Sequence, residues 1–195
     1  MKHLNKITFL IACALPSFCI AQKDSTLRLV KTISGNISPK SVVAANNGYV
    51  YAQNMMYKHS VTVYNKQGIL VQTIYDTVHP AHYGHTDSSE VLKGSPVEAS
   101  LNADGSSLWI SNYCMIGKGY SNPGCDGCVG RNKYDKSYLY RINTSNYEKT
   151  ACIKSGAVPK YLLVSPNDKY LAVSNWSDGT VTIYSAVSNE RMEDI

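Results

Sequence analysis

One sequence pattern occurs three times along the chain. Each copy starts with a proline, continues through a short apolar segment, passes a polar turn of Asn, Asp or Gly, and returns through a second apolar segment that ends in asparagine. The proline and asparagine that bound the copies are Pro39 and Asn54, Pro96 and Asn112, and Pro159 and Asn175. Their separation is 15, 16 and 16 residues. A repeat this regular predicts one supersecondary unit used three times.

Each copy is predicted to contain four strands. Two strands flank the polar turn, a third follows the asparagine, and a fourth follows another polar turn. Four short antiparallel strands joined by tight turns are typical of a β-propeller blade. The sequence therefore predicts an all-β fold of about three four-stranded antiparallel blades, at about residues 34–75, 92–153 and 154–195.

The third copy, residues 159–184, resembles the YVTN-repeat family of β-propellers in the lactonase-like superfamily. In that family a proline precedes the innermost strand, a Pro-Asp or Pro-Asn turn follows it, and the second strand ends in asparagine. The resemblance covers most of residues 34–195. It implies a seven-bladed propeller, often secreted or periplasmic. Because the family includes structural, binding and lactonase-like members, the resemblance indicates the fold much better than the activity.

Three blades are too few for a closed ring, since propellers typically have at least about four. Residues 26–33 are similar to the fourth strand at 69–74. We expect them to form an outer strand of a blade whose inner strands are absent from the chain. The sequence thus predicts an incomplete propeller, the N-terminal part of a longer one.

The first 21 residues have the pattern of a secretory signal peptide. Lys2 and Lys6 precede an almost wholly apolar stretch at 7–20, and small residues stand before a possible cut at Gln22. We expect cleavage there and a secreted or periplasmic protein. Lipid anchoring at Cys13 and a retained anchor are the alternatives. No later segment is apolar enough to cross a membrane, so no transmembrane segment is expected after cleavage.

The expected mature domain, residues 22–195, has a mild positive charge. The whole chain has a formal net charge of +5, which becomes +3 when Lys2 and Lys6 are removed. The basic residues are scattered along the sequence, whereas nucleic-acid binding proteins gather them on one face. We therefore expect no nucleic-acid partner.

Two connections are long where the other turns are short. They are residues 75–94, which lead into the second blade, and residues 114–136, which lie inside it. Both follow strands that run in the same direction, so we expect them to emerge on one face beside the channel mouth and to approach each other. Loops of about 20 residues are uncommon without a function or disorder. The sequence predicts a ligand-binding face there, with tolerated surface insertions as the alternative.

The first long loop contains His79, His82 and His85. Three imidazoles could bind zinc or copper. Their three-residue spacing suits a helix, however, and Pro80 and Gly84 break one. We expect a polar, pH-responsive loop with no bound metal and no cofactor.

Four cysteines remain after the expected cleavage. Cys114 and Cys152 should stand two strand spacings apart, beyond disulfide reach. Cys125 and Cys128 are close in the second long loop and are predicted to form a disulfide in an oxidising compartment. No histidine follows Cys128 and no second Cys-x-x-Cys occurs, which excludes the haem-attachment and four-thiolate zinc patterns.

The predicted innermost strands supply the candidate ligand-binding residues. Ser41, Glu98 and Tyr161 occupy equivalent positions, and Lys160 precedes Tyr161. A carboxylate on an innermost strand is costly unless it is solvated or paired, so Glu98 is the candidate acid or metal ligand. No residue is assigned as catalytic, since no Gly-x-Ser-x-Gly, His-Glu-x-x-His or phosphate-loop motif occurs.

These patterns favour a non-catalytic exported scaffold. We expect it to bind an unknown protein, glycan or small ligand through the long-loop face. The alternative is a lactonase-like hydrolase with a carboxylate or metal site near Glu98 at the channel mouth, and a third reading is a degenerate, inactive gene product. A hydrolase should hold a divalent metal or several converging charged residues at that mouth.

Overall fold

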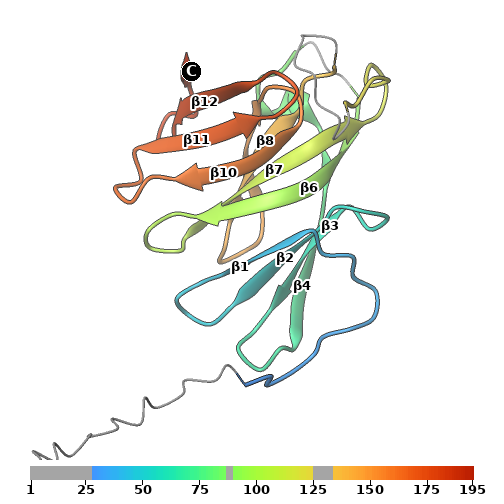
Figure 1. Ribbon diagram of the computed structural model, residues 1–195, viewed down its shortest axis with the longest axis vertical. Helices are drawn as coiled ribbons and strands as arrows, with labels where there is room; N and C mark the ends of the chain where they lie inside the picture. The colour runs from blue at the N-terminus through green and yellow to red at the C-terminus, as the bar shows by residue number, and fades with distance from the viewer. Residues whose placement is uncertain (1–27, 87–89, 125–133) are drawn as a thin grey trace, which may run out of the picture. The chain divides into compact units, whose positions relative to one another are not determined.

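A computed structural model describes residues 28–86, 90–124 and 134–195 (Figure 1). The predicted signal peptide and the Cys125–Cys128 pair lie outside these residues. The described part consists of short antiparallel strands and one 3-10 helix, η1 (Pro80–Tyr83). It contains no helix long and apolar enough to span a membrane.

The first and third sheets each have four strands in sequence order. The first contains β1 (Ser41–Ala44), β2 (Val50–Asn54), β3 (Ser60–Tyr64) and β4 (Leu70–Tyr75). The third contains β10 (Pro159–Val164), β11 (Tyr170–Asn175), β12 (Thr180–Ser185) and β13 (Arg191–Asp194). All neighbours pair antiparallel, as expected for blades built by successive hairpins.

The middle sheet has five strands, one more than the sequence predicts. Its strands are β5 (Thr77–Val78), β6 (Leu92–Leu101), β7 (Ser107–Ile116), β8 (Tyr138–Asn143) and β9 (Lys149–Lys154). The additional strand β5 belongs to the first long loop and pairs with the beginning of β6, where Thr77 lies opposite Lys93. β6 and β7 have ten residues each and extend into both long loops.

The sheets pack face to face through two apolar cores. Tyr51 and Val61 of the first sheet pack with Leu108 and Ile110 of the second. The opposite face of the second sheet packs against the third sheet through a core that contains Trp109. Because strand residues alternate between faces, β7 supplies Leu108 and Ile110 to one core and Trp109 to the other. This is the packing of successive propeller blades, and it confirms the predicted all-β propeller-type fold (Figure 1).

The innermost strands are adjacent. Ser41 Oγ lies 2.7 Å from the carbonyl oxygen of Val97, which joins β1 to β6. The backbone N–H of Val164 donates to Ser100 Oγ at 3.1 Å, which joins β10 to β6. The candidate residues of the three repeats therefore stand on neighbouring strands.

The prediction of an outer strand at residues 26–33 is wrong over its described part. Residues 28–33 form no strand. Similarity to the strand at 69–74 gives the segment strand-forming residues, but a strand forms only where a neighbouring strand pairs with it. Residues 26 and 27 lie outside the described residues.

The repeat asparagines link parts of the same blade by hydrogen bonds. Asn54 Nδ2 donates to Thr62 Oγ1 at 3.0 Å, and its Oδ1 accepts the N–H of Ser38 at 3.0 Å. Asn175 bonds in the same way to Thr182 Oγ1 at 2.8 Å and to the N–H of Gly156 at 3.1 Å. Each asparagine thus ties the third strand to the chain just before the innermost strand. Their role is structural, as the repeat position predicts.

Candidate functional site

The two long loops meet at one end of the middle sheet. Tyr83 of the first loop and Tyr120 of the second pack against the same apolar cluster, which includes Leu92 and Met115. Lys118 Nζ also lies 3.4 Å from Glu90 Oε1, across the two loops. The predicted approach of the loops is confirmed.

The second loop begins later than the sequence suggests. Lys93 pairs with Ile116 and Gly94 pairs with Met115, so β7 continues past Cys114. β8 separates β7, which carries Cys114, from β9, which carries Cys152. The expected two strand spacings between these cysteines are therefore present.

The three loop histidines do not converge on one point. The rings of His79 and His82 stack with centroids 4.8 Å apart. His85 instead turns toward the sheet, where its Nε2 lies 2.7 Å from the carbonyl oxygen of Cys152 and its ring packs edge-on against Tyr138. Among the described residues, no three histidine, cysteine or acidic side chains gather in a way that could hold a metal ion.

The inner-strand candidates fall into two groups. Ser41 and Glu98 lie together: burial raises the pKa of Glu98, while the Ser41 hydroxyl and the charge of Lys40 act in the opposite direction. Glu98 is half-buried on β6, so it keeps access to solvent.

The second group lies around Lys160. Its ammonium is 3.5 Å from the centroid of the Trp176 ring and 5.8 Å from that of Tyr113, so two aromatic faces surround one cation. Tyr161 is exposed beside it. The sequence does not predict these aromatic partners: Trp176 follows β11 and Tyr113 lies within β7, and the sequence does not show that both side chains turn toward Lys160.

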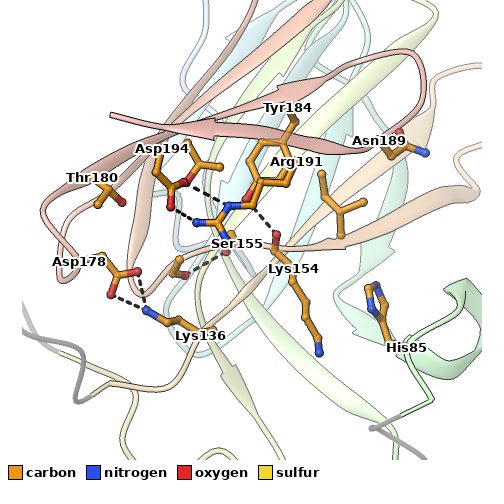
Figure 2. Close-up of a pocket in the computed structure, with 13 residues that line it drawn as sticks. His85, Lys136, Lys154, Ser155, Asp178, Thr180, Tyr184, Asn189, Arg191 and Asp194 are labelled. Atoms are coloured by element: carbon orange, nitrogen blue, oxygen red, sulfur yellow. Dashed lines mark hydrogen bonds and ion pairs between the residues drawn. The ribbon is translucent and has the colours of Figure 1, made fainter.

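A pocket of about 500 Å³ lies between β9 and the third sheet (Figure 2). Each long loop contributes one residue to it: His85 comes from the first loop and Lys136 from the end of the second. The remaining wall comes from β9, β12, β13 and the turns beside them. The pocket therefore joins the long-loop end to the outer strands of the third blade.

Charged pairs line this pocket. Lys136 Nζ lies 2.7 and 2.8 Å from the two carboxylate oxygens of Asp178, and Asp178 Oδ2 also accepts the N–H of Ala157 at 2.8 Å. Arg191 forms an ion pair with Asp194 on the opposite side, as Figure 2 shows. Each acidic group of the pocket is thus matched by a cation.

Two hydroxyl groups of the pocket also form hydrogen bonds within the protein. Thr182 Oγ1 donates to Asp194 Oδ1 at 2.7 Å, and the Tyr184 hydroxyl donates to the carbonyl oxygen of Lys154 at 2.9 Å. Burial raises the pKa of Tyr184 to about 12. The arrangement is a fixed set of polar groups that can bind a ligand by hydrogen bonds.

Comparison with known proteins identifies the fold and no family. No family model matches the sequence, and no curated protein matches it. Among solved structures, Kuenenia stuttgartiensis hydrazine synthase matches with a TM-score of 0.57 and 12% identity, over 86% of this chain and 38% of that one. A putative 6-phosphogluconolactonase from Bacteroides fragilis matches with a TM-score of 0.54 and 18% identity, over 85% and 41%.

The WD40 repeats of RRP9 match as well, with a TM-score of 0.55 and 11% identity, over 84% of this chain and 40% of that chain. This chain therefore spans about two fifths of the length of the structures that it matches. At these identities the likeness shows a propeller-type fold alone. It does not distinguish the YVTN family from other propellers.

Proposed function

We propose that the chain is an exported, non-catalytic propeller scaffold that binds a polar ligand at its long-loop end. The observation that carries the proposal is the pocket of about 500 Å³ to which both long loops contribute a residue. Small-molecule sites are typically clefts of about 300–1,000 Å³. Loops held by rigid sheets are also where binding residues concentrate. The apolar stretch at residues 7–20 supports the export part of the proposal.

The chemistry of the pocket favours binding over proton transfer. Asp178 is paired with Lys136 and Asp194 with Arg191, so both carboxylates are already engaged in ion pairs. A general acid or base needs a pKa near the working pH, whereas that of Tyr184 is about 12. Alternating cations, carboxylates and hydroxyls suit a ligand rich in hydroxyl groups, and we infer a glycan or a polar peptide segment.

We expect the variant Lys136→Ala to bind at least about tenfold more weakly than the wild type, because it removes a donor and leaves Asp178 without its cation. The measurement is a glycan-array screen followed by calorimetric titration of any oligosaccharide retained. The matched control is Lys169→Ala, which removes a lysine outside the pocket. Equal binding by all three proteins, or no retained oligosaccharide, would contradict the proposed site.

A lactonase-like hydrolase is the second candidate. It is favoured by the raised pKa of Glu98 beside the Ser41 hydroxyl, and by matched structures that are described as putative 6-phosphogluconolactonases. Under the binding proposal, the wild type and Glu98→Gln should hydrolyse a six-membered aldonolactone at the same rate as buffer. Turnover that is lost in Glu98→Gln, and retained in Lys136→Ala, would establish the hydrolase instead.

A further inference from the structure

A buried carboxyl group lies at the junction between the first two sheets. Asp76 follows β4 and is 3% exposed. Its backbone is fixed on both sides: its N–H donates to the carbonyl oxygen of His59 at 3.1 Å, and its carbonyl oxygen accepts the N–H of Gly94 at 2.7 Å. Yet Asp76 Oδ2 is buried with no hydrogen-bond partner, and so is Asn112 Oδ1.

Both oxygens lie close to the same point beside Gly94. A Cβ atom at Gly94 would overlap both Asp76 Oδ2 and Asn112 Oδ1, so both oxygens crowd the same point beside the glycine. Because glycine has no side chain, Gly94 leaves room for both oxygens. Two acceptor oxygens in such a position repel unless a hydrogen atom lies between them.

The amide of Asn112 cannot supply that hydrogen. Asn112 Nδ2 already donates to the carbonyl oxygen of Tyr138 at 3.1 Å. Turning the amide over would direct Nδ2 toward Asp76 but would place Oδ1 against the carbonyl oxygen of Tyr138, which is another acceptor. Neither orientation satisfies both contacts. A protonated Asp76 would supply the missing donor.

In the other repeats this problem does not arise. The corresponding Asn175 Oδ1 accepts the N–H of Gly156, and Asn54 Oδ1 accepts the N–H of Ser38. In the middle repeat the N–H of Gly94 is taken by the carbonyl oxygen of Asp76, which leaves Asn112 Oδ1 without its usual donor. In the middle repeat a protonated Asp76 would thus take the place of the backbone N–H that donates to the asparagine oxygen in the other repeats.

We propose that Asp76 is held as a neutral carboxylic acid that donates its proton to Asn112 Oδ1, and that loss of this proton is a pH switch on the first long loop. Asp76 lies directly between β4 and β5, at the start of that loop. Ionisation turns the donor into an acceptor, so the loop base loses its link to β7. The loop carries His85 of the pocket, which connects the switch to the proposed binding end.

The groups packed around Asp76 are consistent with this assignment. Burial raises the pKa of Asp76 to about 7, against the charges of Lys149 on β9 and Lys93 on β6. Lys149 Nζ is bound to the carbonyl oxygen of Tyr75 at 2.7 Å, which directs one of its donors to the backbone. The carboxyl group therefore titrates in the neutral range despite two nearby cations.

Cys152 and Tyr140 stay neutral in that range, and His59 loses its proton at a lower pH than a free imidazole. Burial raises the pKa of Cys152 on β9 to about 12 and raises that of Tyr140 on β8 well above its ordinary value. Burial and Lys93 lower the pKa of His59, which precedes β3. Near pH 7 the change of charge at this junction belongs to Asp76.

The sign of the effect follows from the raised pKa. Between about pH 4 and pH 7 the folded chain holds a proton on Asp76 that the unfolded chain releases. The contribution of Asp76 to the free energy of unfolding is largest at the acidic end of that window. It falls as the pH rises through the window and stays constant above it.

The test compares the wild type with Asp76→Asn, whose amide can donate to Asn112 Oδ1 at any pH. From pH 5 to pH 7, the unfolding constant of the wild type relative to that of the variant should rise by about tenfold per pH unit. Urea denaturation over a pH series measures it. The control Glu90→Gln neutralises an exposed carboxylate in the same loop and should keep the wild-type slope. Equal slopes in wild type and Asp76→Asn would overturn the proposal.

A second measurement does not depend on the variant folding. Infrared spectra of the wild type should contain the C=O absorption of a protonated carboxyl group that disappears with a midpoint near pH 7. Hydrogen exchange of the amides at residues 77–86 should accelerate over the same pH range, after correction for the intrinsic rate. A wild-type protein without that absorption at pH 6 has an ionised Asp76, and the switch would be excluded.

Discussion

Replacing Trp109 by alanine should lower the free energy of unfolding by about 3–5 kcal/mol, the loss typical of a large aromatic side chain removed from a core. Trp109 is 1% exposed and lies in the core between the second and third sheets, with Leu139 and Leu162. The Arg141 guanidinium carbon lies 5.5 Å from the ring centroid and covers one face. The variant leaves a cavity where the two sheets meet, and it removes this cation–π contact.

The matched control is Trp176→Ala. Trp176 is 48% exposed and lies against the Lys160 ammonium, so we expect a loss of less than about 1 kcal/mol. Circular dichroism in urea measures both variants without relying on tryptophan fluorescence. Equal losses would mean that Trp109 does not hold the sheets together. The packing that places β9 beside the third sheet, and so forms the pocket between them, would then need another explanation.

The sequence predicts the fold well because the repeat carries local information. Proline before an inner strand, polar residues at the turn and asparagine after the second strand each act within a few residues of the structure they specify. The alternation of Leu108, Trp109 and Ile110 also indicates two buried faces. β5 was missed because two residues, Thr77 and Val78, form a strand only by pairing with the extended beginning of β6.

The candidate site is predicted less completely, since its residues meet only after the blades pack. Ser41 and Glu98 come together because equivalent positions of adjacent inner strands face each other. Lys136 and Asp178 are 42 residues apart, and nothing in the sequence pairs them. Asp178 stands in a turn beside Gly179, a setting in which aspartate is common for local reasons. The pocket was therefore not predictable from composition or spacing.

Replacing Asn175 by alanine should lower the free energy of unfolding by about 2–4 kcal/mol, because buried polar groups lose their partners. Asn175 is 1% exposed. Its Nδ2 donates to Thr182 Oγ1 at 2.8 Å and to Thr180 Oγ1 at 3.2 Å, while its Oδ1 accepts the N–H of Gly156 at 3.1 Å. The truncated side chain leaves the Gly156 N–H and the buried Thr182 hydroxyl without this partner.

The matched control for Asn175 is Asn146→Ala, in an exposed turn. Asn146 Nδ2 donates to Glu148 Oε2 at 2.8 Å and its Oδ1 accepts the N–H of Glu148 at 3.1 Å, so it also makes hydrogen bonds through both atoms of its amide. Water can replace these bonds, and we expect a loss of less than about 1 kcal/mol. Thermal or urea unfolding of both variants measures the two losses.

Because Gly156, Thr180 and Thr182 all line the pocket, Asn175→Ala should also weaken ligand binding, whereas Asn146→Ala should not. A stable Asn175→Ala protein would show that the repeat asparagine is not what fixes the start of the innermost strand, and the shared proline-to-asparagine spacing would need another physical cause.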